Sequence, residues 1–112
     1  MVRGKLEQRV MVLLWQAGEP LSVVDVQGLL ARDRDLAYTT VMTVLDRLAK
    51  KGLAKREMKR RAWHYEPADP QAVVLARDMA GLLSDVPAEG RREALRLLDE
   101  TLLREATESE AH

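Results

Sequence analysis

A chain of 112 residues without cysteine has room for one compact unit, or for a small domain with an appended segment, and it can form neither disulfides nor thiolate metal sites. The net charge is zero, but residues 1–65 carry 13 Lys and Arg against 7 Asp and Glu, whereas residues 66–112 carry 5 against 11. The resulting +6 and −6 indicate that only the front half meets a polyanion, unless the solvated charges are segregated by chance.

Two short helices are predicted at the start of the chain. Apolar residues of the first recur at helical spacing: Leu6, Val10, Leu13, Leu14 and Ala17. Gly18 would end this helix, and Pro20 and Leu21 are expected to be extended. The second helix should begin at Ser22, whose hydroxyl can cap the amide of Asp25 while the Asp25 carboxylate reaches back to the Ser22 amide.

A third helix is predicted over residues 38–51, with Gly52 at its end. Its core stripe comprises Val41, Val44, Leu45 and Leu48. The opposite side carries Thr39, Thr40, Thr43, Asp46, Arg47 and Lys50, with Met42 at its margin. Threonine methyl and hydroxyl groups and a forked guanidinium suit the base edges of a major groove. A solvated helix face is the alternative, and Lys50 and Lys51 could contact phosphates or only complement the helix dipole.

A β-hairpin is predicted after the third helix. Residues 53–58 and 62–66 are short extended runs separated by Lys59, Arg60 and Arg61. Three adjacent cations beside a groove-sized helix favour phosphate contacts, although a solvated turn has the same composition. Trp63 and Tyr65 share one face of the second strand and are expected to pack on the helices, with His64 on the solvent side.

Two more helices follow, separated by Pro87, and residues 107–112 are expected to fray. Their apolar residues are too numerous for two helices standing alone, and we expect most of them to form a dimer interface: Leu75, Met79, Leu82, Leu83, Val86, Leu95, Leu98 and Leu102. Packing of the same leucines within one monomer is the alternative.

The order of elements predicts the fold. Three helices followed by a hairpin within about 65 residues form a winged helix-turn-helix. We therefore expect a mainly α protein with a small β-hairpin, in which residues 1–67 form a winged-helix DNA-binding domain and residues 68–112 a two-helix dimerisation region.

Catalysis and cofactor binding have no support in the sequence. No Ser–His–acid arrangement or glycine-rich phosphate loop is recognisable, and two histidines without cysteine favour no metal site, so we expect no enzyme activity and no cofactor. The first residues lack a signal-peptide apolar region and the apolar runs are too short for a membrane span. A cytoplasmic protein is the expectation.

The segments LAYTTVMTVLDRLAKKGL and AKREMKRRAWHYEP, together with LEQRVMVLLWQAGEPLSVVDVQGLL, resemble the penicillinase and methicillin-resistance repressor family of the BlaI/MecI type. The resemblance covers roughly residues 5–67 and implies a homodimeric winged-helix repressor on a palindromic operator. The resemblance also implies that the third helix contacts the bases and that residues 59–63 form the wing. The base-reading residues would be Thr39, Thr40, Met42, Thr43 and Arg47.

Three features depart from that family pattern. Arg60 stands where the wing turn often has Gly, and the C-terminal region is shorter than the usual three-helix segment. Members that a sensor protease inactivates are cut at an Asn-Phe bond, and this chain has neither residue. Induction by that cut is therefore not supported, and the sequence does not identify the inducing signal. A ligand-responsive winged-helix regulator of another family and a winged-helix protein-interaction module are the alternative functions.

Overall fold

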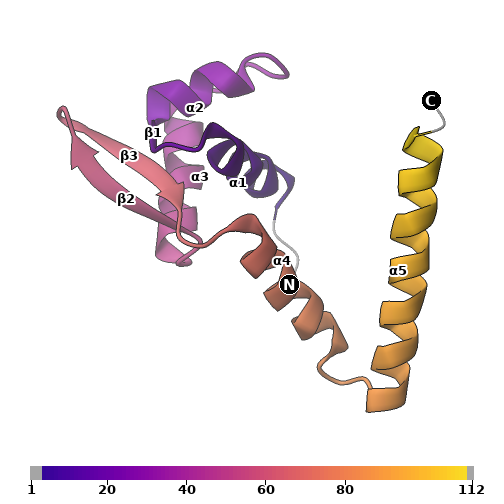
Figure 1. The fold of residues 1–112 in the computed structure, drawn as a ribbon. Helices are drawn as coiled ribbons and strands as arrows, with labels where there is room; N and C mark the ends of the chain where they lie inside the picture. Colours follow the sequence, from indigo (N-terminus) through magenta and orange to yellow (C-terminus); the bar gives the residue numbers. More distant parts are fainter. Residues whose placement is uncertain (1–3, 111–112) are drawn as a thin grey trace. The chain divides into compact units, whose positions relative to one another are not determined.

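The computed structural model describes residues 4–110 and contains, in that range, five helices and three strands (Figure 1). In chain order they are α1 (Lys5–Ala17), β1 (Leu21–Ser22), α2 (Val23–Leu30), α3 (Tyr38–Lys50), β2 (Ala54–Lys59), β3 (Ala62–Pro67), α4 (Gln71–Leu83) and α5 (Ala88–Glu110). The chain forms two compact units, unit 1 (Met1–Ala76) and unit 2 (Arg77–His112). A compact unit need not fold independently, so the domain boundary after residue 67 stays a prediction.

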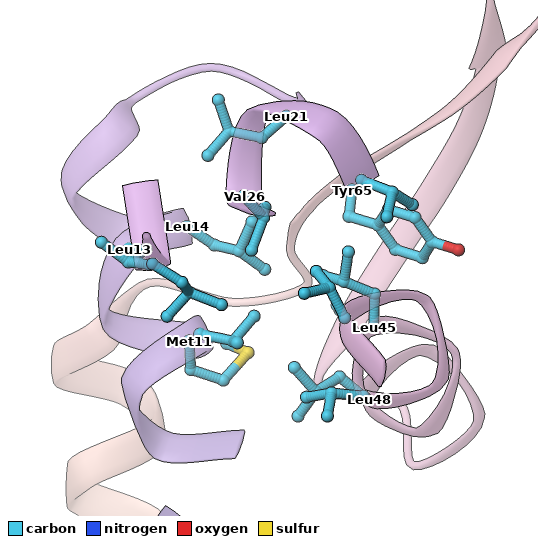
Figure 2. Packing of buried hydrophobic residues seen from close by; sticks show 14 residues of the cluster. Met11, Leu13, Leu14, Leu21, Val26, Leu45, Leu48 and Tyr65 are labelled. Carbon is cyan, nitrogen blue, oxygen red and sulfur yellow. The ribbon is translucent and has the colours of Figure 1, made fainter. Parts of the chain in front are cut away.

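The core of unit 1 lies between α1, α2, α3 and the strands. Its largest fully buried side chains are Tyr65, Met11, Leu14, Leu30, Leu45, Leu48, Val10, Val26 and Val41. Figure 2 shows leucines from different helices pointing toward one another, with the Tyr65 ring beside them and its oxygen turned outward. Each such side chain contributes about 1.5–3 kcal/mol by leaving water, so this cluster holds the three short helices together.

Helix ends in unit 1 follow the local sequence. The Ser22 hydroxyl accepts a hydrogen bond from the Asp25 amide at 3.1 Å, and the Asp25 carboxylate accepts one from the Ser22 amide at 3.0 Å. The predicted capping box is therefore confirmed. Gly18 and Gly52 have φ of 68° and 77°, the left-handed conformation in which glycine meets no Cβ penalty.

The sheet has one strand more than the predicted hairpin. Its order is β1-β3-β2, all antiparallel, with Leu21 opposite Tyr65. Strand β1 is only two residues long, so no alternation of polar and apolar residues marks it in the sequence. It forms because β3 offers a free edge once α1 and α2 are packed.

The hairpin turn is tighter than predicted. Lys59 pairs with Ala62, so Lys59 belongs to β2 and only Arg60 and Arg61 form the turn. Both have positive φ, 52° and 65°, which a two-residue type I′ turn requires and which asparagine and glycine adopt most easily. Each arginine held there costs roughly 1–2 kcal/mol.

Unit 2 is built differently. Between α4 and α5, Arg91 donates from Nε to the Val86 carbonyl at 2.6 Å and from Nη2 to the Ser84 carbonyl at 2.9 Å. A Cβ on Gly90 would lie 2.8 Å from the Val86 side chain, so a larger residue at this corner would require that side chain to move. Helix α5 continues to Glu110, so the expected fraying from residue 107 is wrong as far as Glu110, and residues 111–112 lie outside the described range.

Candidate nucleic-acid interface

Helix α3 has three sides with different surroundings. Its predicted core stripe is confirmed, because Val41, Val44, Leu45 and Leu48 are at most 5% exposed. The side away from the core is exposed and carries Thr39, Thr40, Thr43, Arg47 and Lys50. The third side faces the hairpin. A 13-residue helix is therefore fixed by the core on one side while a row of threonines and one arginine is left open.

The hydroxyl of Thr43 is partly used within the helix. Its Oγ1 donates to the Thr39 carbonyl at 2.8 Å, which orients the side chain. The Thr43 methyl group and the remaining oxygen lone pairs are what the side chain can offer a partner. This favours an apolar contact, such as one with a thymine methyl, at that position.

The side of α3 toward the hairpin contains Asp46, which the sequence placed on the outer side. Asp46 Oδ1 accepts a hydrogen bond from the Tyr65 hydroxyl at 2.8 Å and one from Arg56 Nη1 at 3.3 Å. Burial raises the pKa of the Tyr65 hydroxyl, and the bond to Asp46 adds to the rise. The placement of Asp46 is corrected because helical spacing alone cannot show which flank the hairpin covers.

A groove of about 330 Å³ lies between α3, the hairpin and the start of α2. From α3 it is lined by Tyr38, Met42 and Asp46, and from the hairpin by Arg56, Arg61 and Trp63 among others. Met42 is 36% exposed and thus lies at the edge of the open side, where the sequence placed it. The groove joins the open side of α3 to the cations of the hairpin.

The two aromatic residues of β3 have different environments. Tyr65 packs into the core as predicted, with 1% exposure, but Trp63 is 40% exposed and the expectation that it packs on the helices is wrong. The Arg56 guanidinium lies 4.2 Å from the centre of the Trp63 ring, a cation–π distance. Trp63 lies nearer the hairpin tip than Tyr65, and there an arginine covers it instead of a helix.

The predicted cations are not equivalent. Lys50, Lys59, Arg60 and Arg61 are exposed, and Lys59 Nζ lies 3.9 Å from Glu57. Lys51 Nζ instead donates to both carboxylate oxygens of Glu7 in α1, at 2.9 and 3.1 Å. The Glu7 side chain is only 9% exposed, so Lys51 neutralises a buried acid.

Glu7 was not predicted from the sequence. It shares a helical face with Val10 and Leu14, and an acid within an apolar stripe is a signal for a paired cation. The sequence could have suggested such a pair, but it could not have named Lys51, which is 44 residues away.

The candidate dimer residues lie on α4, on α5 and in the link between them. Leu75, Met79, Leu82, Leu95, Leu98 and Leu102 are between 39% and 74% exposed. Leu83 and Val86 are partly buried, and Val86 lies in the link, after the end of α4. Single exposed leucines are common, but a row of them on one helix, as at Leu95, Leu98 and Leu102, is unusual on a surface that meets only water.

A model of a family described as penicillinase repressor matches residues 3–111. The chain belongs to the penicillinase repressor family. The transcriptional regulator BlaI of Mycobacterium tuberculosis, from strains CDC 1551 / Oshkosh and H37Rv, is 44% identical over 91 residues, covering 81% of this chain and 66% of the relative. The chain thus spans slightly less than two thirds of these relatives. This membership confirms the resemblance drawn from the sequence.

Solved structures agree on the fold. The monomeric form of Bacillus licheniformis BlaI in complex with the blaP half-operator is 24% identical, with a TM-score of 0.53 over 64% of this chain and 87% of that one. A MarR family protein from Bacillus stearothermophilus is 19% identical, with a TM-score of 0.55 over 96% of this chain and 77% of that one. The predicted winged-helix fold class is confirmed.

Residues 4–110 contain neither a candidate metal site nor a helix that could span a membrane. In that range no three His, Asp or Glu side chains gather closely enough to hold a metal ion. None of the helices described there combines the length and apolar character of a membrane span.

Proposed function

We propose that this protein is a transcriptional repressor that binds a palindromic DNA operator as a homodimer. The observation that carries the proposal is the open side of α3, where threonines and Arg47 are exposed while the opposite side is fixed in the core. Membership in the penicillinase repressor family supports it, as do the two relatives described as transcriptional regulators.

In this proposal the residues divide into two groups. The reading group meets base edges in the major groove and comprises Thr39, Thr40, Met42, Thr43 and Arg47. The phosphate group positions the protein and comprises Lys50, Lys59, Arg60 and Arg61. Lys51 is left out of the second group because its ammonium is held by Glu7.

The dimer is proposed from the exposed leucines of α4 and α5. A second copy of the chain would cover them, and a two-fold axis would place two reading helices about 34 Å apart, one turn of B-DNA. The proposal includes no catalysis and no cofactor. Because the proposed partner is operator DNA, which in a bacterium lies in the cytoplasm, we place the protein there.

The test begins by selecting a preferred duplex from a random pool with the full chain. Arg47→Ala should cost about 1–3 kcal/mol at one base-pair position and relax the preference there. Lys50→Ala is the matched control, because it should weaken binding to all duplexes alike and lower the salt slope by about 0.9.

Two results would contradict the proposal. Equal binding of selected and random duplexes, with little salt dependence, would indicate a protein-interaction module instead. Release of DNA by a small molecule that also raises the melting temperature, with no protease present, would favour a ligand-responsive regulator.

A further inference from the structure

The reading helix and the wing are joined by a polar network that neither group of DNA-binding residues uses. Asp46 on α3 accepts hydrogen bonds from Tyr65 on β3 and from Arg56 on β2. Arg56 in turn lies over the Trp63 ring. The network thus links a helix to two strands.

We propose that Asp46 and Tyr65 are positioning residues that fix the wing relative to α3 and thereby set how sharply the protein distinguishes its operator from other DNA. This inference rests on the proposed function, which assigns base reading to α3 and phosphate contact to the wing. Neither positioning residue contacts a base in this scheme.

Strand register explains why the network reaches α3. Arg56 stands directly opposite Tyr65, and residues paired across two strands point to the same face of the sheet. Tyr65 also pairs with Leu21, so it lies in the central strand. A hydrogen bond from its hydroxyl therefore holds the middle of the sheet, and through it the wing, against the helix.

The Tyr65 hydroxyl is at the end of a side chain that is otherwise inside the core. The residue is 1% exposed, and Figure 2 shows its oxygen turned away from the neighbouring leucines. Because the ring cannot shift without disturbing the core, the position of the oxygen is determined by the packing. A rigid donor at a fixed place suits a positioning role.

The charge of Asp46 also supports a positioning role. It is adjacent to Arg47 on the helix that would enter the groove, where a carboxylate repels phosphates. A solvated acid at this position would only weaken DNA binding. An acid that holds Arg56 and Tyr65 exchanges some affinity for a defined geometry.

The two effects can be separated by two substitutions. Tyr65→Phe leaves the net charge unchanged, so random DNA should bind as before, while the ratio of affinities for the selected and a scrambled duplex falls about fivefold. Asp46→Ala removes both acceptor oxygens and a negative charge, so it should raise affinity for scrambled DNA and still lower that ratio.

Glu66→Gln is the matched control. Glu66 also lies on β3, but within residues 4–110 its charged partner is Lys55, at 3.6 Å on β2, and not a residue of α3. Its substitution removes the same charge and should raise both affinities equally, leaving the ratio unchanged. Because the ratio compares two duplexes on one protein, partial unfolding lowers both affinities and cancels, so a purely structural role would not change it.

Different results would contradict the inference and the proposed function. An unchanged ratio in Tyr65→Phe, with wild-type near-ultraviolet dichroism, would overturn the inference alone. If that variant does not fold, an unchanged ratio in Asp46→Ala has the same meaning. A wild-type protein with a ratio near one would overturn the proposed function, and the inference with it.

Discussion

Unit 1 and unit 2 differ in how far their apolar side chains are buried. In unit 1 three short helices and a sheet enclose a continuous core, and its cluster contains side chains with no exposure at all. In unit 2 the 23 residues of α5 include none that is buried. The first unit therefore has the means to stabilise itself, and the second needs a surface from elsewhere to cover its leucines.

Local interactions in α5 are too weak to replace that surface. Arg96 bonds to Glu93 and Glu100 one turn away on either side, and such exposed pairs contribute roughly 0.2–0.5 kcal/mol each. Helices in proteins owe most of their stability to tertiary packing. The second copy proposed above would supply that surface, so we expect stability to depend on protein concentration in unit 2 and not in unit 1.

The largest expected effect is on the leucines of α5. Leu98→Asp should weaken dimerisation roughly 100-fold or more, because it would bury a carboxylate without a partner. Leu97→Asp is the control, since Leu97 is 49% exposed but lies off the row formed by Leu95, Leu98 and Leu102. Sedimentation should show a monomer for the first variant and the wild-type state for the second. Equal behaviour of the two would refute a specific interface on this face.

The next effect concerns the buried acid of unit 1. Lys51→Met should lower the free energy of unfolding by about 2 kcal/mol, because Glu7 then stays buried without its cation; partial exposure of Lys51 keeps the loss below that of a fully buried pair. Lys50→Met should change stability by less than about 0.5 kcal/mol. Urea titration measures both. In DNA titrations Lys50→Met should lose more affinity than Lys51→Met, since only Lys50 is proposed to contact phosphate.

The same variants test whether unit 1 is stable without a second copy of the chain. The loss in Lys51→Met should be the same at all protein concentrations, because the ion pair lies wholly within unit 1. A loss that grows on dilution would mean that unit 1 also depends on the second copy.

The wing turn provides a third test. Replacing Arg60 by Asn and Arg61 by Gly should raise the free energy of unfolding by about 1 kcal/mol, because both new residues adopt positive φ more easily. Arg60→Gln with Arg61→Gln is the control that removes the same charges and keeps the strain. Both double variants should lose DNA affinity equally and reduce the salt slope by about 1.8. A stability gain in the glutamine variant would show that charge repulsion, not backbone strain, is relieved.

Sequence reasoning succeeded where the cause is local. The capping box of Ser22 and Asp25 spans three residues, and the core stripe of α3 repeats within two turns, so spacing alone determined them. The exposed leucines of α5 also follow from spacing, although their partner does not.

The sequence did not predict features that depend on a distant residue. Asp46 is bonded to Tyr65, which is 19 positions away, and β1 exists only because β3 lies beside it. Periodicity showed that Asp46 is outside the core, but only the position of the hairpin decides whether it faces DNA or the wing. For the same reason, the sequence could not distinguish Lys51 from Lys50, two adjacent cations with different surroundings.

The smallest effect is expected at the start of α2, and it has a defined pH dependence. The pKa of the Asp25 carboxyl is lowered from its ordinary value of 3.8, first by the hydrogen bond from the Ser22 amide and then by the Ser22 side chain. Because the folded pKa is below the unfolded one, the stabilisation is present above about pH 4 and is lost as the pH falls through the lowered value.

Asp25→Ala should therefore cost about 0.5–1 kcal/mol near neutral pH and progressively less as the medium becomes acidic. Urea titrations of both proteins at pH 7 and at about pH 3 measure the difference. Since Asp25 belongs to unit 1, the difference should not vary with protein concentration. A cost that stays constant down to pH 3 would mean that the helix start is stabilised by the shape of the side chain and not by its charge.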